Sequence, residues 1–440
     1  MANANKQNRK RLPVDSSLLQ SKLAVTCKTF TDEVFATLRK TQRRMAASLF
    51  GSLIERGSTL VSVLARVLAP QRRIATKKQR ETLSRWLQTL ELLPSVQERL
   101  AKHAQAYWKE ETPTAIDCSD LSKMFGGEGM EGMEWGRDGS TGGQSMGHLF
   151  VTAAIVPGHH VAAIPVWTQL HKGKKGAMEL MEAAVEKAHE LSAGRSVAIV
   201  DRGGDGLAFL SWLLAKGHRA VVRIAHLSRD VFGADRPIDR ELARCAGKNV
   251  TLLRNSGRRQ PAVLRWKVGH LPMNLSKKKA ADPAYRGVLV VESRFDGKSL
   301  HLYAFLPDGE LSDPAALERR ALQAAQFYLQ RWQIETSFLR VKQDFGLELA
   351  RVRTFRRLEN LFALCHLGYL FTQFRLKETR EHKTFVKILR DNFGQLNQRP
   401  EVFLANLREL LRERIIRHIT GRPPKAPPGD IPGQLRFRLA

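Results

Sequence analysis

The sequence predicts an α/β protein whose core is interrupted by an inserted antiparallel β domain and flanked by helical N-terminal and C-terminal domains. Three observations support this prediction. Apolar residues recur three and four apart through residues 15–110, as they do in amphipathic helices. From residue 111, short apolar runs alternate with helical patterns, as in α/β proteins. A block of short β-rich runs then precedes one long helical pattern near residue 330.

These changes of pattern divide the chain into a helical N-terminal DNA-binding domain, the first part of a core, a β-rich insertion, a core helix, a helical C-terminal domain and a tail. The tail is rich in Pro and Gly, so it should be extended or disordered. The expected limits are, in that order, 1–110, 111–229, 230–312, 313–350, 351–422 and 423–440.

The N-terminal region is expected to contain several basic helices separated by breaks at Gly57 and Pro70. Short basic helices joined by tight breaks are compatible with a helix-turn-helix reader of DNA. A plain helical bundle fits the pattern equally well, and both readings stay open.

The first part of the core begins with strands at 114–120, 148–156 and 159–170. A helix follows, then the strand 196–200 and a second helix at 206–217. Three strands, a helix, a strand and a helix is the order of a ribonuclease H-like core. The β-rich runs after residue 230 are separated by Gly, Asp, Asn and Lys clusters and predict the inserted antiparallel sheet.

The charge of the chain favours polyanionic partners. Lys+Arg number 72 against 43 Asp+Glu, which gives a net charge of +29 and a pI near 10.4. Such a surplus attracts nucleic acid, although ribosomal and secreted cationic proteins share it. The cations are spread along the chain, which suits contact with nucleic acid over a long track.

Other global features predict a cytoplasmic protein without a membrane segment. No stretch has the roughly 18 uninterrupted apolar residues that a membrane span needs, and the basic N-terminus has no apolar stretch after it. The four cysteines are far apart and form no C-x-x-C pair, so neither a zinc site nor a disulfide framework is expected.

The stretch from Tyr328 to Lys342 should form one helix with the residues before it. At 100° per residue, Tyr328, Arg331, Glu335 and Lys342 fall within a stripe roughly 60° wide. One carboxylate among cations suits a site that holds a metal ion and a polyanion together. A solvated face with ordinary i,i+4 pairing is the alternative.

Two further carboxylates complete a candidate catalytic set. Asp117 and Asp201 each directly follow a short apolar run at a predicted strand end, where active sites of α/β sheets lie. With Glu335 they could hold two Mg²⁺ ions that cut a phosphodiester bond. An Asp in this position is otherwise a turn former or helix cap. Asp120 and Asp205 are nearby rivals, and Asp205 is expected to cap or begin the following helix.

The pattern Y-x2-R-x3-E-x6-K, matched by Tyr328, Arg331, Glu335 and Lys342, resembles the signature of cut-and-paste DDE transposases of insertion-sequence family four. The stretch that starts at Asp201 is similar to the segment around that family's second catalytic Asp. Asp117 lies where that family's first catalytic Asp is expected, after the first core strand. An inserted β domain before the Glu helix is another similarity.

The resemblance implies a bacterial, nucleoid-associated enzyme that acts as a homodimer on two transposon ends, each marked by a terminal inverted repeat. Asp117, Asp201 and Glu335 would bind two Mg²⁺ ions, with Mn²⁺ as a substitute. The enzyme would cut double-stranded DNA at the transposon end and join the free 3′ hydroxyl to target DNA.

Relatives of this type release the element through a hairpin intermediate, with a base flipped out of the duplex and stacked on an aromatic residue. Trp266 and Tyr303 are the candidates for that stacking, with ordinary sheet packing as the alternative. Arg202 and Arg223 are candidates for DNA contact near the site, with surface ion pairs as the alternative.

Three other functions remain possible from the sequence. One is a ribonuclease H-like nuclease that acts outside transposition, and another is a transposase-derived protein that binds DNA without cutting. A basic structural protein of the nucleoid would explain the charge but would leave the three acids unexplained.

Overall fold

The computed structural model shows that the chain forms two compact units. One unit contains 1–57, 62–83 and 378–440, and the other contains 58–61 and 84–377. The residues that the structure describes are 16–68, 73–122, 129–137, 143–158, 161–172, 176–233, 236–254, 257–272, 285–306 and 310–375.

The first unit is helical in its described part, as predicted. It contains α1 (Ser16–Val34), α2 (Lys40–Arg56), nearly all of α3 (Val61–Leu68) and the first part of α4 (Arg73–Thr89). The rings of Phe30 and Phe50 join α1 to α2 with their centroids 6.0 Å apart. The predicted break at Gly57 is confirmed, because this glycine adopts φ 56° and its N–H caps the carbonyl of Leu53.

The second unit is built on one sheet of ten strands, counted over the described residues. The strand order is β2-β3-β1-β5-β6-β10-β9-β8-β7, with β4 paired to β3. β1, β5 and β6 are parallel to one another, and the remaining pairs are antiparallel. The strands are β1 (Thr112–Ser122), β2 (Glu134–Arg137), β3 (Gln144–Ile155), β4 (Ile164–Leu170), β5 (Ser196–Val200), β6 (Ala220–Arg223), β7 (Lys248–Leu253), β8 (Arg259–Pro272), β9 (Tyr285–Phe295) and β10 (Lys298–Phe305).

The mixed α/β class and the predicted order of core elements are confirmed. The separate inserted domain is not confirmed, because the strands of 230–312 continue the core sheet. β10 pairs antiparallel with β6, with Leu302 opposite Arg223. This pairing satisfies the backbone groups that β6 would otherwise present as an open edge.

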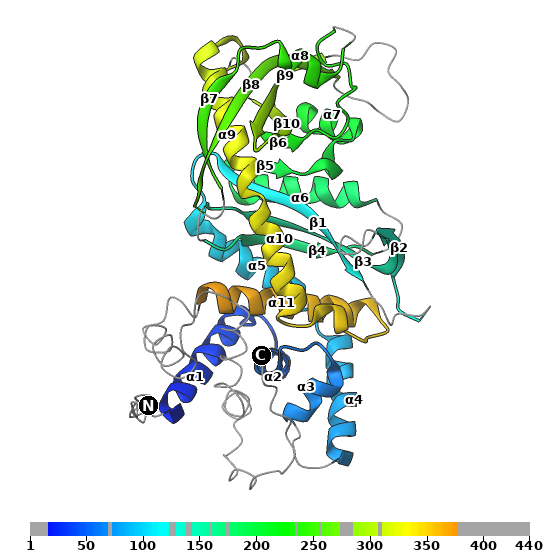
Figure 1. The fold of residues 1–440 in the computed structure, drawn as a ribbon. Coiled ribbons are helices and arrows are strands. Elements are labelled where there is room, and N and C mark those ends of the chain that lie inside the picture. Colours follow the sequence, from blue (N-terminus) through cyan, green and yellow to red (C-terminus); the bar gives the residue numbers. More distant parts are fainter. Residues whose placement is uncertain are drawn as a thin grey trace, which may run out of the picture. The chain divides into compact units, whose positions relative to one another are not determined.

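Helices surround this sheet within the second unit (Figure 1). They are α5 (Leu93–Ala104), α6 (Ala177–Leu191), α7 (Leu207–Lys216), α8 (Ile238–Ala243), α9 (Pro314–Gln330), α10 (Trp332–Gln343) and α11 (Phe355–Leu370). In the part of the chain covered by the structure, none of the helices has the length and apolarity that a membrane crossing requires.

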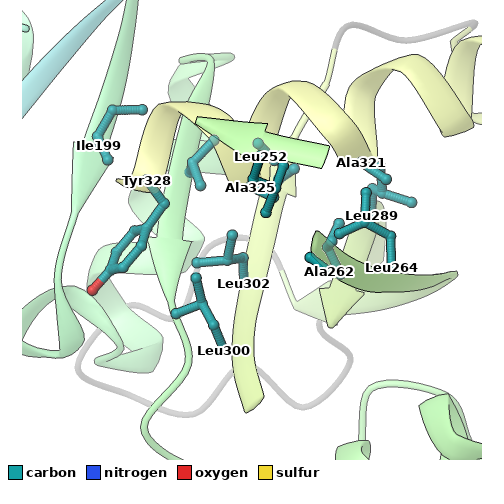
Figure 2. Close-up of a cluster of buried hydrophobic side chains, with 14 of the residues drawn as sticks. Ile199, Leu252, Ala262, Leu264, Leu289, Leu300, Leu302, Ala321, Ala325 and Tyr328 are labelled. Carbon is teal, nitrogen blue, oxygen red and sulfur yellow. The ribbon is translucent and has the colours of Figure 1, made fainter. Parts of the chain in front are cut away.

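The helix α9 packs along β5–β10 through small side chains. Ala321, Ala324 and Ala325 are buried against leucines of the strands, among them Leu264 and Leu302. Alanine has no side chain beyond Cβ, so the helix axis can approach the sheet closely. Figure 2 shows this cluster. The start of α9 is fixed by Asp313, whose side chain accepts a hydrogen bond from the N–H of Ala315 at 2.9 Å.

The single helix expected through Tyr328–Lys342 is divided between α9 and α10 at Arg331. The backbone tightens there, because the N–H of Arg331 bonds to the carbonyl of Tyr328, three residues back, at 3.1 Å. The dihedral angles of Arg331, φ −50° and ψ −37°, are nevertheless helical. The described part of the predicted helical C-terminal domain, 351–422, is helical, because it contains α11 and a following π turn that ends at residue 375. The rest of that domain and the tail lie outside the described residues.

Candidate active site

The parallel pairing of β1 with β5 places the two aspartates side by side. Ile116 is opposite Val200 in this pairing, so Asp117 and Asp201 follow at the same level. Asp201 is extended, with φ −82° and ψ −176°, and therefore faces the same side as Ile199 two residues earlier. Ile199 belongs to the cluster under α9. Both aspartates consequently lie at the C-terminal end of α9.

Arg331 joins the three predicted carboxylates. Its Nη1 donates to Oδ2 of Asp117 at 2.7 Å, and its Nη2 lies 3.4 Å from Oδ2 of Asp201. The same Nη2 also donates to Glu335, one helical turn along the chain. Arg331 is only 6% exposed. Three acids that are far apart in the sequence thus converge on one buried cation.

Tyr328 and Arg223 support Asp201 from the other side. The Tyr328 hydroxyl donates to Oδ1 of Asp201 at 2.6 Å, and Nη1 of Arg223 lies 3.5 Å from the same oxygen. The Tyr328 ring lies between cations, 5.7 Å from Cζ of Arg331 and 5.9 Å from Cζ of Arg223. Figure 2 shows its hydroxyl directed away from the apolar cluster. Arg223 therefore forms an ion pair, the alternative given for it, within the candidate site, and its contact with DNA stays a prediction.

The environment separates the pKa values of the two aspartates. Burial raises the pKa of Asp117 to about 6; Arg331 opposes this rise, and the negative charges of Asp201 and Glu335 add to it. Burial also acts to raise the pKa of Asp201, but Arg331 and the Tyr328 hydroxyl outweigh it and lower that pKa. Burial raises the pKa of Tyr328 to about 12, with a further contribution from Asp201. Such separation is typical of functional sites.

The donor set fits a hard divalent cation. Carboxylate oxygens are the ligands that Mg²⁺ prefers in proteins, and three carboxylates lie around the Arg331 guanidinium here. In the arrangement that the structure describes, no three acidic, His or Cys side chains are grouped so that they could hold a metal ion. The three carboxylates exceed the two guanidinium charges of Arg331 and Arg223, so the cluster can accept further positive charge.

Lys342 lies beside β1, the strand that contains Asp117. Its Nζ is 3.6 Å from Oδ1 of Asp120 and 3.3 Å from Oε1 of Glu348. Asp120 also accepts a hydrogen bond from the Ser122 hydroxyl at 2.6 Å. The rival carboxylate Asp120 therefore pairs with the last cation of the stripe.

The expectation that Asp205 caps or begins the next helix is wrong. α7 begins at Leu207 with Gly206 as its N-cap and no side-chain cap. Asp205 is instead buried, 1% exposed, and accepts hydrogen bonds from the backbone N–H groups of Ala225 and His226 at 2.6 and 2.8 Å. It also pairs with Arg229. This carboxylate anchors the loop that follows β6.

The two aromatic residues expected to stack on a base are placed in the sheet. Tyr303 has no exposed surface, and its hydroxyl accepts a hydrogen bond from Arg229 at 3.3 Å. Trp266 is partly buried against the cluster under α9. Because the Tyr303 ring is buried, a flipped base cannot reach it, and Tyr303 packs in the sheet as the alternative interpretation predicted. Arg202 is exposed, directly after Asp201.

An aromatic side chain that was missed lies at the site. Trp332, the first residue of α10, is 58% exposed and follows Arg331. A helical wheel places Trp332 about 100° from Arg331, outside the stripe of charged residues. A large aromatic residue next to that stripe was the signal in the sequence that could have identified it.

Comparison with known families gives a match over much of the chain. The family model described as a transposase DDE domain matches residues 108–371, a range that includes Asp117, Asp201 and Glu335. No curated protein gives a match to the chain.

Proposed function

Since the chain belongs to the transposase DDE domain family, we propose that it cuts and joins DNA at the ends of its own mobile element. The enzyme binds the terminal inverted repeats, hydrolyses a phosphodiester bond at each transposon end and transfers the 3′ ends to target DNA. The observation that carries the proposal is the convergence of Asp117, Asp201 and Glu335 on Arg331.

In this proposal the three carboxylates hold Mg²⁺, two ions in all, and Mn²⁺ can substitute. Bound there, the ions would activate the attacking water or hydroxyl and stabilise the leaving oxygen. Tyr328 keeps Asp201 in position through its 2.6 Å hydrogen bond. The depressed pKa of Asp201 keeps that carboxylate ionised at neutral pH.

The cations of the site contact phosphate. We expect Arg331, which is now held by the three carboxylates, and the partly exposed Arg223 to bind phosphate oxygens in a forked geometry. Lys342 adds a charge further along α10. The exposed Trp332 ring, beside Arg331, offers a surface on which an unpaired base could stack. In this role Trp332 is a candidate beside the partly buried Trp266, whereas Tyr303 is fully buried.

The assignment to one family of insertion sequences rests on the charged stripe and its tyrosine. Tyr328, Arg331, Glu335 and Lys342 keep the spacing of the insertion-sequence family four signature, and we place the chain in that family. The helical N-terminal region would then read the inverted repeat, and two copies of the chain would hold the two ends.

The test is cutting of DNA that bears the ends of the element, with Mg²⁺, with Mn²⁺ and with a chelator. Asp117→Asn, Asp201→Asn and Glu335→Gln should each abolish cutting while the protein still binds the DNA. Glu190→Gln is the matched control, since Glu190 is an exposed carboxylate of α6, paired with Lys187.

The other outcomes separate the alternatives. Equal cutting of DNA with and without the terminal repeats would favour a ribonuclease H-like nuclease outside transposition. Binding without cutting by the unaltered chain would favour a transposase-derived DNA-binding protein. Full cutting by one of the three variants would remove that residue from the catalytic set.

A further inference from the structure

The tips of two hairpins in the sheet carry a cluster of cations that the candidate active site does not use. The β7–β8 hairpin ends with Leu253 opposite Arg259, and the β9–β10 hairpin turns at Asp296–Gly297. We name their exposed cations the hairpin-tip platform, which consists of Arg254, Arg258, Arg259, Arg294 and Lys298.

The two tips are fastened to each other by Asp296. Its Oδ2 accepts hydrogen bonds from Nη2 of Arg254 at 3.2 Å and from Nε2 of Gln260 at 2.5 Å. Asp296 and Gly297 have φ 48° and 71°, the positive values that a type I′ hairpin turn requires at both central residues. The Arg254 guanidinium also lies 5.5 Å from the Phe295 ring centroid. The platform therefore lies on two hairpin ends that are joined by Asp296.

The charge of the platform is left largely unmatched. Only Arg254 pairs with a carboxylate; within the described residues, the other four platform cations have none within ion-pair distance. Cations further along the same strand are matched instead, because Arg265 pairs with Glu292 and Lys267 pairs with Glu241, each at 2.9 Å. Strand alternation places Arg254 and Lys298 on the face under α9 and Arg259 and Arg294 on the other face. The tips therefore present positive charge on both faces of the sheet, and such charge attracts a polyanion.

The platform lies at the same end of the strands as the candidate active site. Leu302 of β10 is opposite Arg223, the last residue of β6, and Arg223 contacts Asp201. β10 begins at Lys298, four residues before Leu302, which is roughly 13 Å further along at the rise of a strand. Phosphates of a DNA strand recur about every 3.4 Å. A duplex held at the carboxylates could therefore reach the platform within about one helical turn.

We propose that the hairpin-tip platform binds phosphates of the DNA duplex that flanks the bond being cut. The inference rests on the proposed function, since it takes the carboxylates as the cutting site. It adds a second contact surface, on strands β7–β10, that fixes the path of the duplex beyond the reacting phosphate.

The experiment measures DNA binding without cutting. Affinity for a blunt duplex of about 40 bp, roughly four helical turns, is measured in chelator over a range of salt concentrations. The variant replaces Arg258, Arg259, Arg294 and Lys298 with Gln. Loss of four phosphate contacts should reduce the slope of log affinity against log salt by about 3 to 4 units.

A matched variant removes the same charge elsewhere in the unit. Arg85, Lys102, Lys109 and Arg240 are exposed cations without a carboxylate within ion-pair distance among the described residues. They are replaced with Gln, and this variant should keep the slope of the unaltered protein. Circular dichroism melts check that both variants remain folded.

Equal slopes for the platform variant and the unaltered protein would overturn the proposal, as would equal losses in the two variants. A change of slope seen with single-stranded RNA but absent with duplex DNA would assign the platform to RNA and overturn it as well. These readings are independent of catalysis, so failure of the proposed function would appear separately, as absence of metal-dependent cutting by the unaltered protein.

Discussion

Two clusters in the sheet-containing unit each combine an arginine, an aspartate and a tyrosine, and only one of them carries surplus charge. In the first, which we name the anchor cluster, Arg229 pairs with Asp205 and lies 5.9 Å from the Tyr303 ring centroid. Backbone N–H groups occupy the remaining acceptor positions of Asp205. One cation meets one anion, and the cluster is buried.

The cluster around Arg331 has the same residue types in a different balance. Arg331 meets Asp117, Asp201 and Glu335 at once, and Glu335 is 42% exposed at its side chain. Matched charges in a buried place contribute to folding, because removal of either partner leaves the other unpaired. Surplus carboxylates at a partly exposed place contribute little to folding and are available to a ligand. The balance of charge therefore distinguishes the anchor cluster from the cluster around Arg331, although the two contain the same types of residue.

The largest effect should come from exchanging one aspartate of each cluster. Asp201→Asn should lower the rate of cutting by at least roughly 10³-fold, as for loss of a preorganised charged group. It should lower the free energy of unfolding by less than Asp205→Asn does, because Asp201 is partly exposed. Asp205→Asn should lower that free energy by about 3–5 kcal/mol, the usual result of breaking a buried ion pair. Cutting assays and denaturant melts of both variants check this, and a stable Asp205→Asn protein would contradict the comparison.

The two arginines should respond differently to magnesium. Arg229→Met leaves Asp205 buried without its cation and should cost about 3 kcal/mol or more in the free energy of unfolding, with no recovery in Mg²⁺. Arg331→Met leaves three carboxylates to repel one another, at a cost of about 1–3 kcal/mol. Millimolar Mg²⁺ should raise the melting temperature of Arg331→Met by more than it raises that of the unaltered protein. Equal shifts would mean that the carboxylates do not hold the metal.

Stability should depend on pH through Asp117. Its pKa of about 6 in the folded protein exceeds the value of about 4 for a free aspartate. The folded state therefore holds the proton more tightly, and its stability falls as the pH rises from about 4 to about 6. In chelator, Asp117→Asn should escape this loss and gain about 1–3 kcal/mol over the unaltered protein between these limits. A difference that stays constant with pH would contradict the environment described for Asp117.

The smallest effects should come from the tyrosine hydroxyls. Tyr303→Phe and Tyr328→Phe each remove one hydrogen-bonding group, worth about 1 kcal/mol in the free energy of unfolding. Tyr328→Phe should in addition slow cutting by roughly tenfold, since its hydroxyl holds Asp201. Tyr303→Phe should cut at the normal rate once its stability is taken into account, and a slower rate would bring the anchor cluster into the catalytic machinery.

The site residues could be predicted because short-range patterns encode direction. The spacing of Tyr328, Arg331 and Glu335 fixes a common face of a helix, and it survived the junction at Arg331 because the dihedral angles there remain helical. Asp117 and Asp201 could be identified because each ends an apolar run, and the register of the two strands then brings them level.

The predictions that failed depend on contacts with residues far away in the sequence, and a local sequence pattern does not contain those contacts. Alternation along a strand assigns Tyr303 to a face but does not reveal that the face is covered. The partners of Asp205 are about 20 residues away in the sequence, so it resembled a helix cap. The strands β7–β10 were recognised individually, whereas the pairing of β10 with β6 depends on an edge that only the assembled sheet displays.

The pairing of Ile116 with Val200 has a consequence for how this enzyme can change through evolution. The separation of Asp117 from Asp201 is set by main-chain hydrogen bonds between two strands, so substitutions around them can alter the surroundings without moving the pair. Deleting a single residue from β5 would instead shift its alternation by one and turn Asp201 to the opposite face of the sheet. Lineages of this chain should therefore tolerate extensive exchange of side chains in β1 and β5 and almost no change in their length.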